Sequence, residues 1–119
     1  MKHRGDLRRG ELFWIDWSPG RGSEQSGVRP GLVVQADAPN RNENYPNTIV
    51  VAVSRAGRDV ASHVVLEPTP DSGLKARSFA KCEQVQTVSK ERVRERIGRV
   101  TTEQMARISI ALKRMMELP

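Results

Sequence analysis

Residues 10–36 of this chain read GELFWIDWSPGRGSEQSGVRPGLVVQA, two strand patterns that are separated by a loop. In residues 10–17 apolar side chains recur at every second position, which is the period of a β-strand. Residues 30–36 are almost entirely apolar, as expected of a strand that is covered on both faces. Residues 18–27 combine proline with glycine, serine and glutamine, a composition typical of a mobile loop. The stretch therefore predicts a strand, a loop and a buried strand.

Arg29 stands between the predicted loop and the second strand. Because Pro30 follows it, the backbone of Arg29 is biased toward an extended conformation. Two interpretations follow for its side chain. It can reach into a cleft beneath the loop, or it can pair with Glu24 or Asp16 and tie the loop down. The local pattern by itself favours the ion pair.

The rest of the chain continues the β pattern and ends in a helix. Further strands are predicted at residues 48–54, 62–67, 78–89 and, as an edge strand, 94–100. Residues 37–47 are dense in turn-forming residues and are expected to be a connection.

The C-terminal helix is predicted from Thr102 to Glu117. Thr101 and Gln104 have the spacing of a capping box, which marks the start of the helix. Apolar residues recur at helical spacing, and we expect them to pack in the core or in a subunit interface: Met105, Ile108, Leu112 and Met115.

These elements predict a mainly β fold of the α+β class, a small curled sheet or barrel of short antiparallel strands with one C-terminal helix. The 119 residues are expected to form a single domain, residues 1–119, in which residues 1–8 are a flexible N-terminal tail. No apolar run approaches the roughly 20 residues that span a bilayer, and the start lacks the apolar segment of a secretion signal. We therefore expect a soluble, cytoplasmic protein that does not bind a membrane.

The chain is strongly basic, with a net charge of +6 and 20 lysine and arginine residues. Fifteen of these are arginine, whose guanidinium group presents a flat fork of donors to a phosphate. This balance favours a polyanionic partner such as nucleic acid, although a solvated basic surface has the same composition.

Several kinds of chemistry lack the residues that they need. Cys82 is the single cysteine, so an internal disulfide or a zinc site is not expected, and no glycine pattern precedes a helix as in a nucleotide-binding loop. His3 is in the tail, and His63 is expected to be a half-exposed strand residue rather than a catalyst. The carboxylates are scattered, so a nuclease built on this chain is expected to use no metal and no cofactor.

Four segments together resemble the MazF/PemK toxins of bacterial toxin–antitoxin systems. They read RRGELFWIDWSPGRGSEQSGVRPGLVVQ, NTIVVAVS, CEQVQTVS and IGRVTTEQMARISIALKRMMEL. The resemblance runs from about residue 9 to residue 118, and GSEQSGVRP is its most specific part. It implies the small SH3-like barrel that this family shares with the CcdB toxins.

The resemblance also implies an activity, that of a sequence-selective, metal-independent endoribonuclease. Such an enzyme cuts single-stranded RNA and leaves a 2′,3′-cyclic phosphate and a 5′-hydroxyl. The catalytic arginine of the family matches Arg29, and its partner, a threonine in the family, matches Ser54, which keeps the hydroxyl and lacks the methyl. We expect Arg29 to stabilise the charge on the phosphate and to donate a proton to the leaving oxygen. Glu24 is a candidate base or a residue that orients Arg29, and the orienting role is favoured.

Further residues are expected to bind RNA. The resemblance points to Ser23 and Gln25 beside the catalytic pair, to Gln84 at a base edge, and to Gln86 where relatives often carry a basic residue. Arg41 and Arg55 are expected to flank the cleft and to contact phosphates, with a solvated surface role as the alternative. Trp14 and Trp17 are candidates to stack on bases, but a core or dimer role is favoured for both.

The expected partners are single-stranded RNA, a second copy of the chain in a homodimer, and an acidic cognate antitoxin that complements the positive charge. Two rival functions remain open. The first is a toxin on the same fold that poisons DNA gyrase without cutting RNA. The second is a basic RNA-binding module that neither cuts nor poisons.

Overall fold

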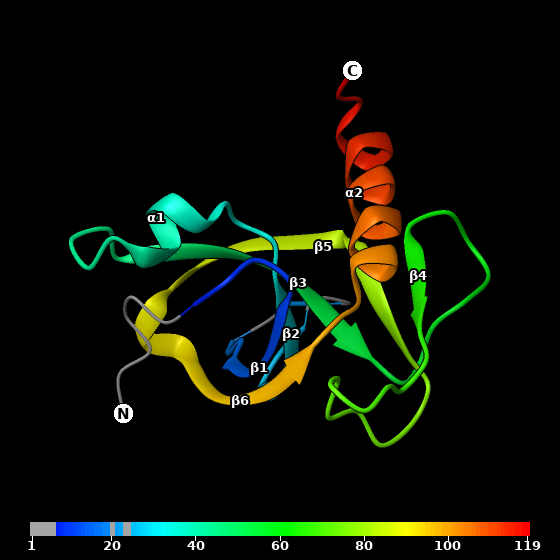
Figure 1. The fold of residues 1–119 in the computed structure, drawn as a ribbon, viewed down its shortest axis with the longest axis horizontal. Coiled ribbons are helices and arrows are strands. Elements are labelled where there is room, and N and C mark those ends of the chain that lie inside the picture. Colours follow the sequence, from blue (N-terminus) through cyan, green and yellow to red (C-terminus); the bar gives the residue numbers. More distant parts are fainter. Residues whose placement is uncertain (1–6, 20, 23–24) are drawn as a thin grey trace.

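The computed structural model describes residues 7–19, 21–22 and 25–119 of the chain (Figure 1). Its strands are β1 (Glu11–Asp16), β2 (Val28–Val33), β3 (Asn47–Ser54), β4 (His63–Leu66), β5 (Ser78–Ser89) and β6 (Val93–Arg99). The helical elements are α1 (Asp37–Arg41), a single 3₁₀ turn η1 (Lys90–Arg92), and α2 (Thr102–Met116). No helix in the described part of the chain is long and apolar enough to cross a membrane.

The six strands form one antiparallel sheet in the order β4-β5-β3-β2-β1-β6. The longest strand, β5, and the edge strand β6 bend around the central strands, which gives the sheet its strong curl (Figure 1). The β3–β5 and β1–β6 pairings contain register shifts, and such irregularities increase the local twist of a sheet. The mainly β fold with a C-terminal helix is confirmed, but β4 and β6 remain as edges, so the sheet is not a closed barrel.

Each predicted strand is present, and β5 has the predicted bounds. The second strand begins at Val28 rather than at residue 30, so Arg29 lies within β2. The connection predicted at residues 37–47 contains the short helix α1. It forms because the ammonium of the buried Lys90 donates hydrogen bonds to three carbonyl oxygens at the end of α1, those of Pro39, Asn40 and Asn42, at 2.9–3.0 Å.

The curled sheet buries an apolar cluster on each face. On one face, β1–β3 contribute side chains such as Leu12 and Val53, and α2 covers them with Ile108 and Leu112. On the other face, the curl encloses a second cluster: Leu7, Phe13, Ile15, Trp17, Val33, Val50, Ala52, Val88 and Val93. Burial on both faces explains why residues 31–34 and the centre of β3 read as continuous apolar runs.

The N-terminal tail predicted at residues 1–8 includes Leu7, whose side chain is completely buried in the second cluster. Residues 1–6 lie outside the described part of the chain.

The capping box of α2 is confirmed. The Thr101 hydroxyl accepts from the Gln104 backbone N–H at 3.0 Å, and the Gln104 side chain accepts from the Thr101 N–H at 2.9 Å. Ile108 and Leu112 are buried as predicted, whereas Met115 is 48% exposed. The apolar stripe therefore extends past the core to a solvent-exposed end of the helix.

Candidate functional site

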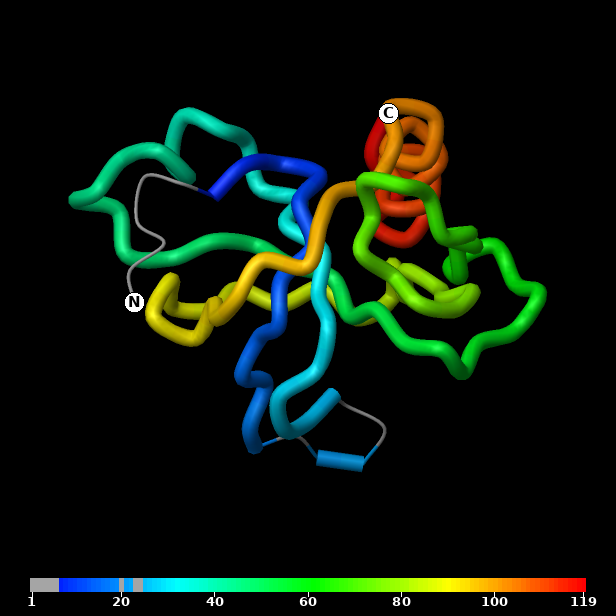
Figure 2. Tube along the Cα trace, turned by 60° about the horizontal axis from the view of Figure 1, so that its bottom comes forward, coloured from blue at the N-terminus to red at the C-terminus, as the bar shows by residue number. Residues whose placement is uncertain are grey.

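The loop between β1 and β2 is anchored at its base. The Trp17 N–H donates to the Gly27 carbonyl oxygen at 2.8 Å, and the Gly27 N–H donates to the Ser18 hydroxyl at 3.1 Å. Gly27 has a φ of +73°, a conformation that side chains other than glycine rarely adopt. Figure 2 shows the ends of β1 and β2 projecting from the body of the molecule. These contacts hold both ends of the loop beside Arg29.

The backbone of Arg29 is fixed from β1. Arg29 pairs with Ile15, and the indole Nε1–H of Trp17 donates to the Arg29 carbonyl oxygen at 3.2 Å. Two residues later, a Cβ at Gly31 would come within 2.4 Å of Ile15 Cδ1, so the sequence needs glycine there for β1 to pack on β2. The exposed side chain of Arg29 therefore extends from a rigid position.

Ser54 ends β3 at the same rim of the sheet. The β2–β3 register sets Gly31 opposite Ala52, and the same register extended by two residues would set Arg29 opposite Ser54. Opposite residues of antiparallel strands point to the same face of a sheet. The Ser54 hydroxyl oxygen accepts from the Ala56 N–H at 3.1 Å, which leaves the hydroxyl proton available to another acceptor.

Arg29 and Ser54 line a pocket of about 700 Å³ at the ends of β2 and β3. β1, β2, β3, β6 and the loop between β4 and β5 contribute to its lining: Trp14, Gln25, Arg29, Pro30, Val53, Ser54, Arg55, Gly73, Leu74, Lys75, Ala76, Ser78 and Ile97.

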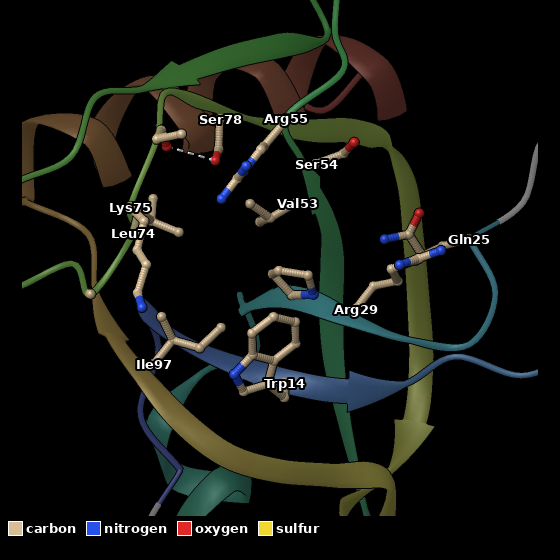
Figure 3. A pocket seen from close by; sticks show the side chains of 13 residues that line it. Trp14, Gln25, Arg29, Val53, Ser54, Arg55, Leu74, Lys75, Ser78 and Ile97 are labelled. Atoms are coloured by element: carbon tan, nitrogen blue, oxygen red, sulfur yellow. Dashed lines mark hydrogen bonds between the residues drawn. The ribbon is translucent and has the colours of Figure 1, made fainter.

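The pocket has two parts, separated by the end of β3 (Figure 3). Arg29, Gln25 and Ser54 lie on one side of the β3 ribbon. On the other side, apolar side chains face the basic side chains of Arg55 and Lys75. The arrangement combines a polar rim with a deeper, partly apolar hollow.

The charge of the pocket is one-sided. Its lining contains three cationic side chains, those of Arg29, Arg55 and Lys75, and no acidic residue within the described ranges. These cations have no side-chain hydrogen bond or ion pair to a residue that the structure describes. By contrast, Arg94 and Arg96 of β6 meet carboxylates of β1 at 3.3 and 2.8 Å. The pocket therefore presents positive charge that is available to an anion.

The predicted site residues fall into three groups. Gln25 and Arg55 line the pocket together with Arg29 and Ser54. Ser23 and Glu24 lie outside the described residues. The remaining three are not among the lining residues: Arg41, Gln84 and Gln86.

Arg41 was expected to flank the cleft, but it ends α1 at the opposite end of β3 from Ser54. The neighbouring Asn40 is bonded to Thr48 near the start of β3, and six residue steps of a strand span roughly 20 Å. Gln86 lies in a different groove, between β5 and α2. The oxygen Oε1 of Gln84 is buried without a hydrogen-bond partner among the described residues.

Sequence reasoning missed Lys75 and Ser78, and it favoured a core or dimer role for both tryptophans. The structure separates them: Trp17 is buried at 2% exposure, whereas Trp14 lines the pocket and is 41% exposed. No local pattern marks Lys75, because it comes to the pocket from a connection that is remote in sequence from β1–β3. Trp14 of β1 and Trp17, just after β1, are three positions apart and so lie on opposite faces of the extended chain, and only the structure shows which face is covered.

Two groups outside the pocket are unsuited to acid–base or nucleophilic catalysis. Burial raises the pKa of the Cys82 thiol to about 12, so it is not a thiolate at neutral pH. His63 accepts from the Arg58 N–H at Nδ1, and its Nε2 lies 2.9 Å from Glu83, so both ring nitrogens are engaged. Both residues are structural.

Asp16 stabilises the start of the loop. A hydrogen bond from the Ser18 backbone N–H is the main cause that lowers the pKa of Asp16; desolvation opposes it, and the Ser18 hydroxyl and the charges of Arg92 and Arg94 lower the pKa further. Its carboxylate is therefore ionised at neutral pH and accepts from the Ser18 N–H at 3.1 Å. This carboxylate bonds to the loop and to β6 rather than to Arg29. Within the described residues, no three histidine, cysteine or acidic side chains are grouped to hold a metal.

The sequence of the chain matches a known family over almost its whole length. Residues 8–116 match the family described as PemK-like, MazF-like toxin of type II toxin–antitoxin systems. The chain belongs to this family. Among named MazF relatives, it is 33% identical to endoribonuclease MazF9 of Mycobacterium tuberculosis, over 94% of this chain and 98% of that protein. It is 34% identical to endoribonuclease EndoA of Bacillus subtilis, over 90% of this chain and 91% of that protein.

Solved structures of MazF proteins share the fold. MazF of Deinococcus radiodurans matches with a TM-score of 0.79 at 20% identity, over 93% of this chain and 96% of that one. A mycobacterial endoribonuclease, solved in complex with its cognate antitoxin, matches with a TM-score of 0.78 at 24% identity, over 95% of this chain and 97% of that one.

Proposed function

We propose that this chain is a toxin that cuts single-stranded RNA at selected sequences, without a metal ion, in the cytoplasm. The observation that carries the proposal is that Arg29 and Ser54 share the rim of a pocket whose described lining is cationic and contains no carboxylate. Membership of the PemK/MazF family and the endoribonuclease names of the relatives support the same reaction.

RNA supplies the nucleophile for this reaction. The 2′-oxygen attacks the adjacent phosphorus, the bond from phosphorus to the 5′-oxygen breaks, and the products are a 2′,3′-cyclic phosphate and a 5′-hydroxyl. One proton leaves the 2′-hydroxyl and one reaches the departing 5′-oxygen, so the reaction needs no external nucleophile. The protein contributes alignment and stabilises the negative charge that builds up on the phosphate oxygens.

Arg29 and Ser54 have the donors for this task. The guanidinium of Arg29 donates hydrogen bonds to the phosphate oxygens and delivers the proton to the leaving oxygen, since it has donors and no acceptor. The hydroxyl of Ser54 donates to a phosphate oxygen, because its own oxygen already accepts from the Ala56 N–H. Glu24, in the loop, is assigned as the residue that orients Arg29 or accepts the 2′-proton.

Polar residues around the pair would hold the RNA. Gln25 and Arg55 line the same pocket, and Ser23 is two positions before Gln25 in the sequence. The buried Oε1 of Gln84 has no partner among the described residues, and leaving such an acceptor unsatisfied costs about 1–3 kcal/mol. A donor on a base edge would satisfy it once the Gln84 side chain turns to the surface. Arg41 and Gln86 would contact RNA only beyond this pocket.

The partners follow from the same assignment. A structural relative is a complex with a cognate antitoxin, and we infer that an acidic antitoxin neutralises this basic chain of net charge +6. We also infer a homodimer, whose candidate surface is the groove between β5 and α2.

The proposal is tested by incubating the purified protein with a long RNA in EDTA and mapping the cut sites by primer extension. Wild-type protein should cut at a recurring short sequence and leave cyclic phosphate ends. Arg29→Ala and Ser54→Ala should each lower the rate by about 100-fold or more, the cost of removing one donor to a developing oxyanion. Arg107→Ala, an exposed arginine on α2, is the matched control and should cut at the wild-type rate.

Cutting that Arg29→Ala does not slow would contradict the mechanism. Intact RNA together with inhibited DNA supercoiling would instead favour the gyrase-poisoning alternative. Salt-sensitive RNA binding with neither effect would leave only the RNA-binding module.

A further inference from the structure

The mechanism above uses only the rim of the pocket. The residues of the hollow beyond the rim indicate a separate role in binding the substrate. We propose that Lys75 and Trp14 form a subsite for the nucleotide next to the cleaved linkage, in which Trp14 stacks on an unstacked base and Lys75 binds that nucleotide's phosphate. This inference rests on the proposed RNA-cutting function, and it assigns one position of the recognised sequence to named residues.

The floor of the hollow is a row of apolar side chains across three strands. Trp14 is paired with Pro30 in the β1–β2 register, and Val53 follows at the neighbouring position of β3. Leu74 and Ile97 close the wall opposite β3. Trp14 is 41% exposed within this lining, although it is the kind of side chain that folding normally buries. An accessible aromatic face on an apolar floor suits the face of a base.

Lys75 enters the hollow from the wall that faces Arg29 across the pocket (Figure 3). The side chain is exposed and has no ion pair or hydrogen bond to the described part of the chain, whereas Arg77, two residues later, bonds Glu67 at 3.4 Å and stacks on Phe79. The two cations of one segment therefore differ: one is available to an anion, and the other is engaged elsewhere.

The segment that carries Lys75 is anchored on both sides. Before it, Gly73 packs so closely on β6 that a Cβ would lie 2.0 Å from the Ile97 carbonyl oxygen, and the Ser72 hydroxyl accepts from the Leu74 N–H at 3.2 Å. After it, the buried Ser78 donates to the Ala76 carbonyl oxygen at 3.1 Å. The Lys75 backbone is thus fixed, and less entropy is lost when its ammonium binds a phosphate.

The size and charge of the hollow match one nucleotide. The pocket of about 700 Å³ is far larger than a phosphate group needs, and it has the catalytic pair at one end and Lys75 with Arg55 at the other. A nucleotide whose linkage is cut at the rim would place its base over Trp14 and its other phosphate near Lys75. Single-stranded RNA can adopt this arrangement because its bases are free to unstack.

The test measures binding of a short RNA that contains the mapped cut site with a 2′-deoxy sugar there, so that it is bound but not cut. Affinities of wild type, Lys75→Ala and Arg77→Ala are measured over a range of salt concentrations. Loss of one phosphate contact should lower the slope of log affinity against log salt by about 0.7 for single-stranded RNA. Lys75→Ala should show this loss, Lys75→Arg should restore it, and Arg77→Ala should keep the wild-type slope.

Trp14 is tested in the same binding assay with the same 2′-deoxy RNA, and the cutting of natural RNA is a second readout. Trp14→Ala should weaken binding about tenfold at every salt concentration, and Trp14→Phe should recover most of it, because stacking needs an aromatic face. An abasic nucleotide at one position next to the cut should remove the difference between Trp14→Ala and wild type. In the cutting assay, Lys75→Ala and Trp14→Ala should each raise KM more than they lower kcat.

Equal salt slopes for Lys75→Ala and Arg77→Ala would overturn the role of Lys75. An abasic position that leaves the Trp14→Ala difference intact would overturn the stacking role. If the wild-type protein cuts no RNA, the proposed function fails, and the same comparison with a single-stranded RNA of mixed sequence still decides whether Lys75 and Trp14 bind RNA.

Discussion

At position 54 the chain carries a serine where the family resemblance implies a threonine. Ser54 keeps the donor, but its side chain has more rotational freedom than a β-branched threonine, whose χ1 angle is restricted. The hydrogen bond from the Ala56 N–H compensates in part, since it fixes the hydroxyl oxygen. The serine is therefore expected to be active and less well oriented.

We predict that Ser54→Thr raises kcat by about two- to tenfold, because a pre-oriented donor loses less freedom in the transition state. Single-turnover cutting of a defined RNA in EDTA measures this directly. Ser54→Val is the matched control, with the shape of threonine and no hydroxyl, and it should be nearly inactive. A valine variant as fast as serine would contradict the donor role.

For single residues, the sequence predicted part of the candidate site. The X-Pro bond and the apolar run after it were enough to predict Arg29 at the start of a fixed strand, and family resemblance paired it with Ser54. Reasoning from neighbours alone favoured an Arg29–Asp16 or Arg29–Glu24 pair, yet Asp16 bonds Ser18 and Arg94 instead. That preference was wrong for Asp16, because β6 supplies its arginines from remote positions in the chain.

Among the elements, α1 depends on a residue far from it in sequence. Its helix-ending carbonyl oxygens are satisfied by the ammonium of Lys90, which is 2% exposed and comes from the turn after β5. Asn40 of α1 is also buried, and it bonds Gln35 and Thr48. Hydrogen bonds from a lysine 48 or more residues away cannot be recognised in the local sequence, so residues 37–47 were predicted as a connection.

We predict that Lys90→Met lowers the free energy of unfolding by about 3 kcal/mol, because three buried carbonyl oxygens lose a charged donor. Urea unfolding at a fixed protein concentration measures the change. The same substitution at the exposed Lys75 should cost less than about 0.5 kcal/mol. Equal losses at the two positions would mean that the hydrogen bonds from Lys90 do not stabilise α1.

The strands and α2 were predictable because their signals are local. Alternation or apolar runs mark the strands, and the Thr101–Gln104 box marks the start of α2. The register shifts in β3–β5 and β1–β6 have no such signal, and they contribute to the curl that brings residues 73–78 over β1 and β2. The pocket wall that contains Lys75 therefore became known only from the structure.

For the whole molecule, a groove of about 430 Å³ between β5 and the end of α2 is the surface that bears on assembly. Apolar side chains that line it are 37–53% exposed: Val85, Met116 and Leu118. Exposed apolar side chains gathered in one groove are typical of a surface that another chain covers. We assign it to the second copy of a homodimer.

We predict that Met116→Glu shifts the protein from dimer to monomer, since a carboxylate buried in an apolar interface would be left without a partner. Light scattering coupled to gel filtration measures the mass over a dilution series. Ile110→Glu is the matched control: Ile110 is 52% exposed on α2 and lines a different groove, so this variant should remain dimeric. A dimeric Met116→Glu, or a wild-type protein that is monomeric, would contradict the assignment.

The central claim is that Arg29 and Ser54 act together on one phosphate, and a double-mutant cycle tests it most directly. Single-turnover rates of cutting are measured in EDTA for wild type, Arg29→Ala, Ser54→Ala and the double variant. If the two donors stabilise the same transition state, the double variant should be about as slow as the slower single variant. If the fold-losses in rate of the two single variants multiply in the double variant, as for independent residues, the account is contradicted. A single variant that cuts at the wild-type rate would contradict it as well.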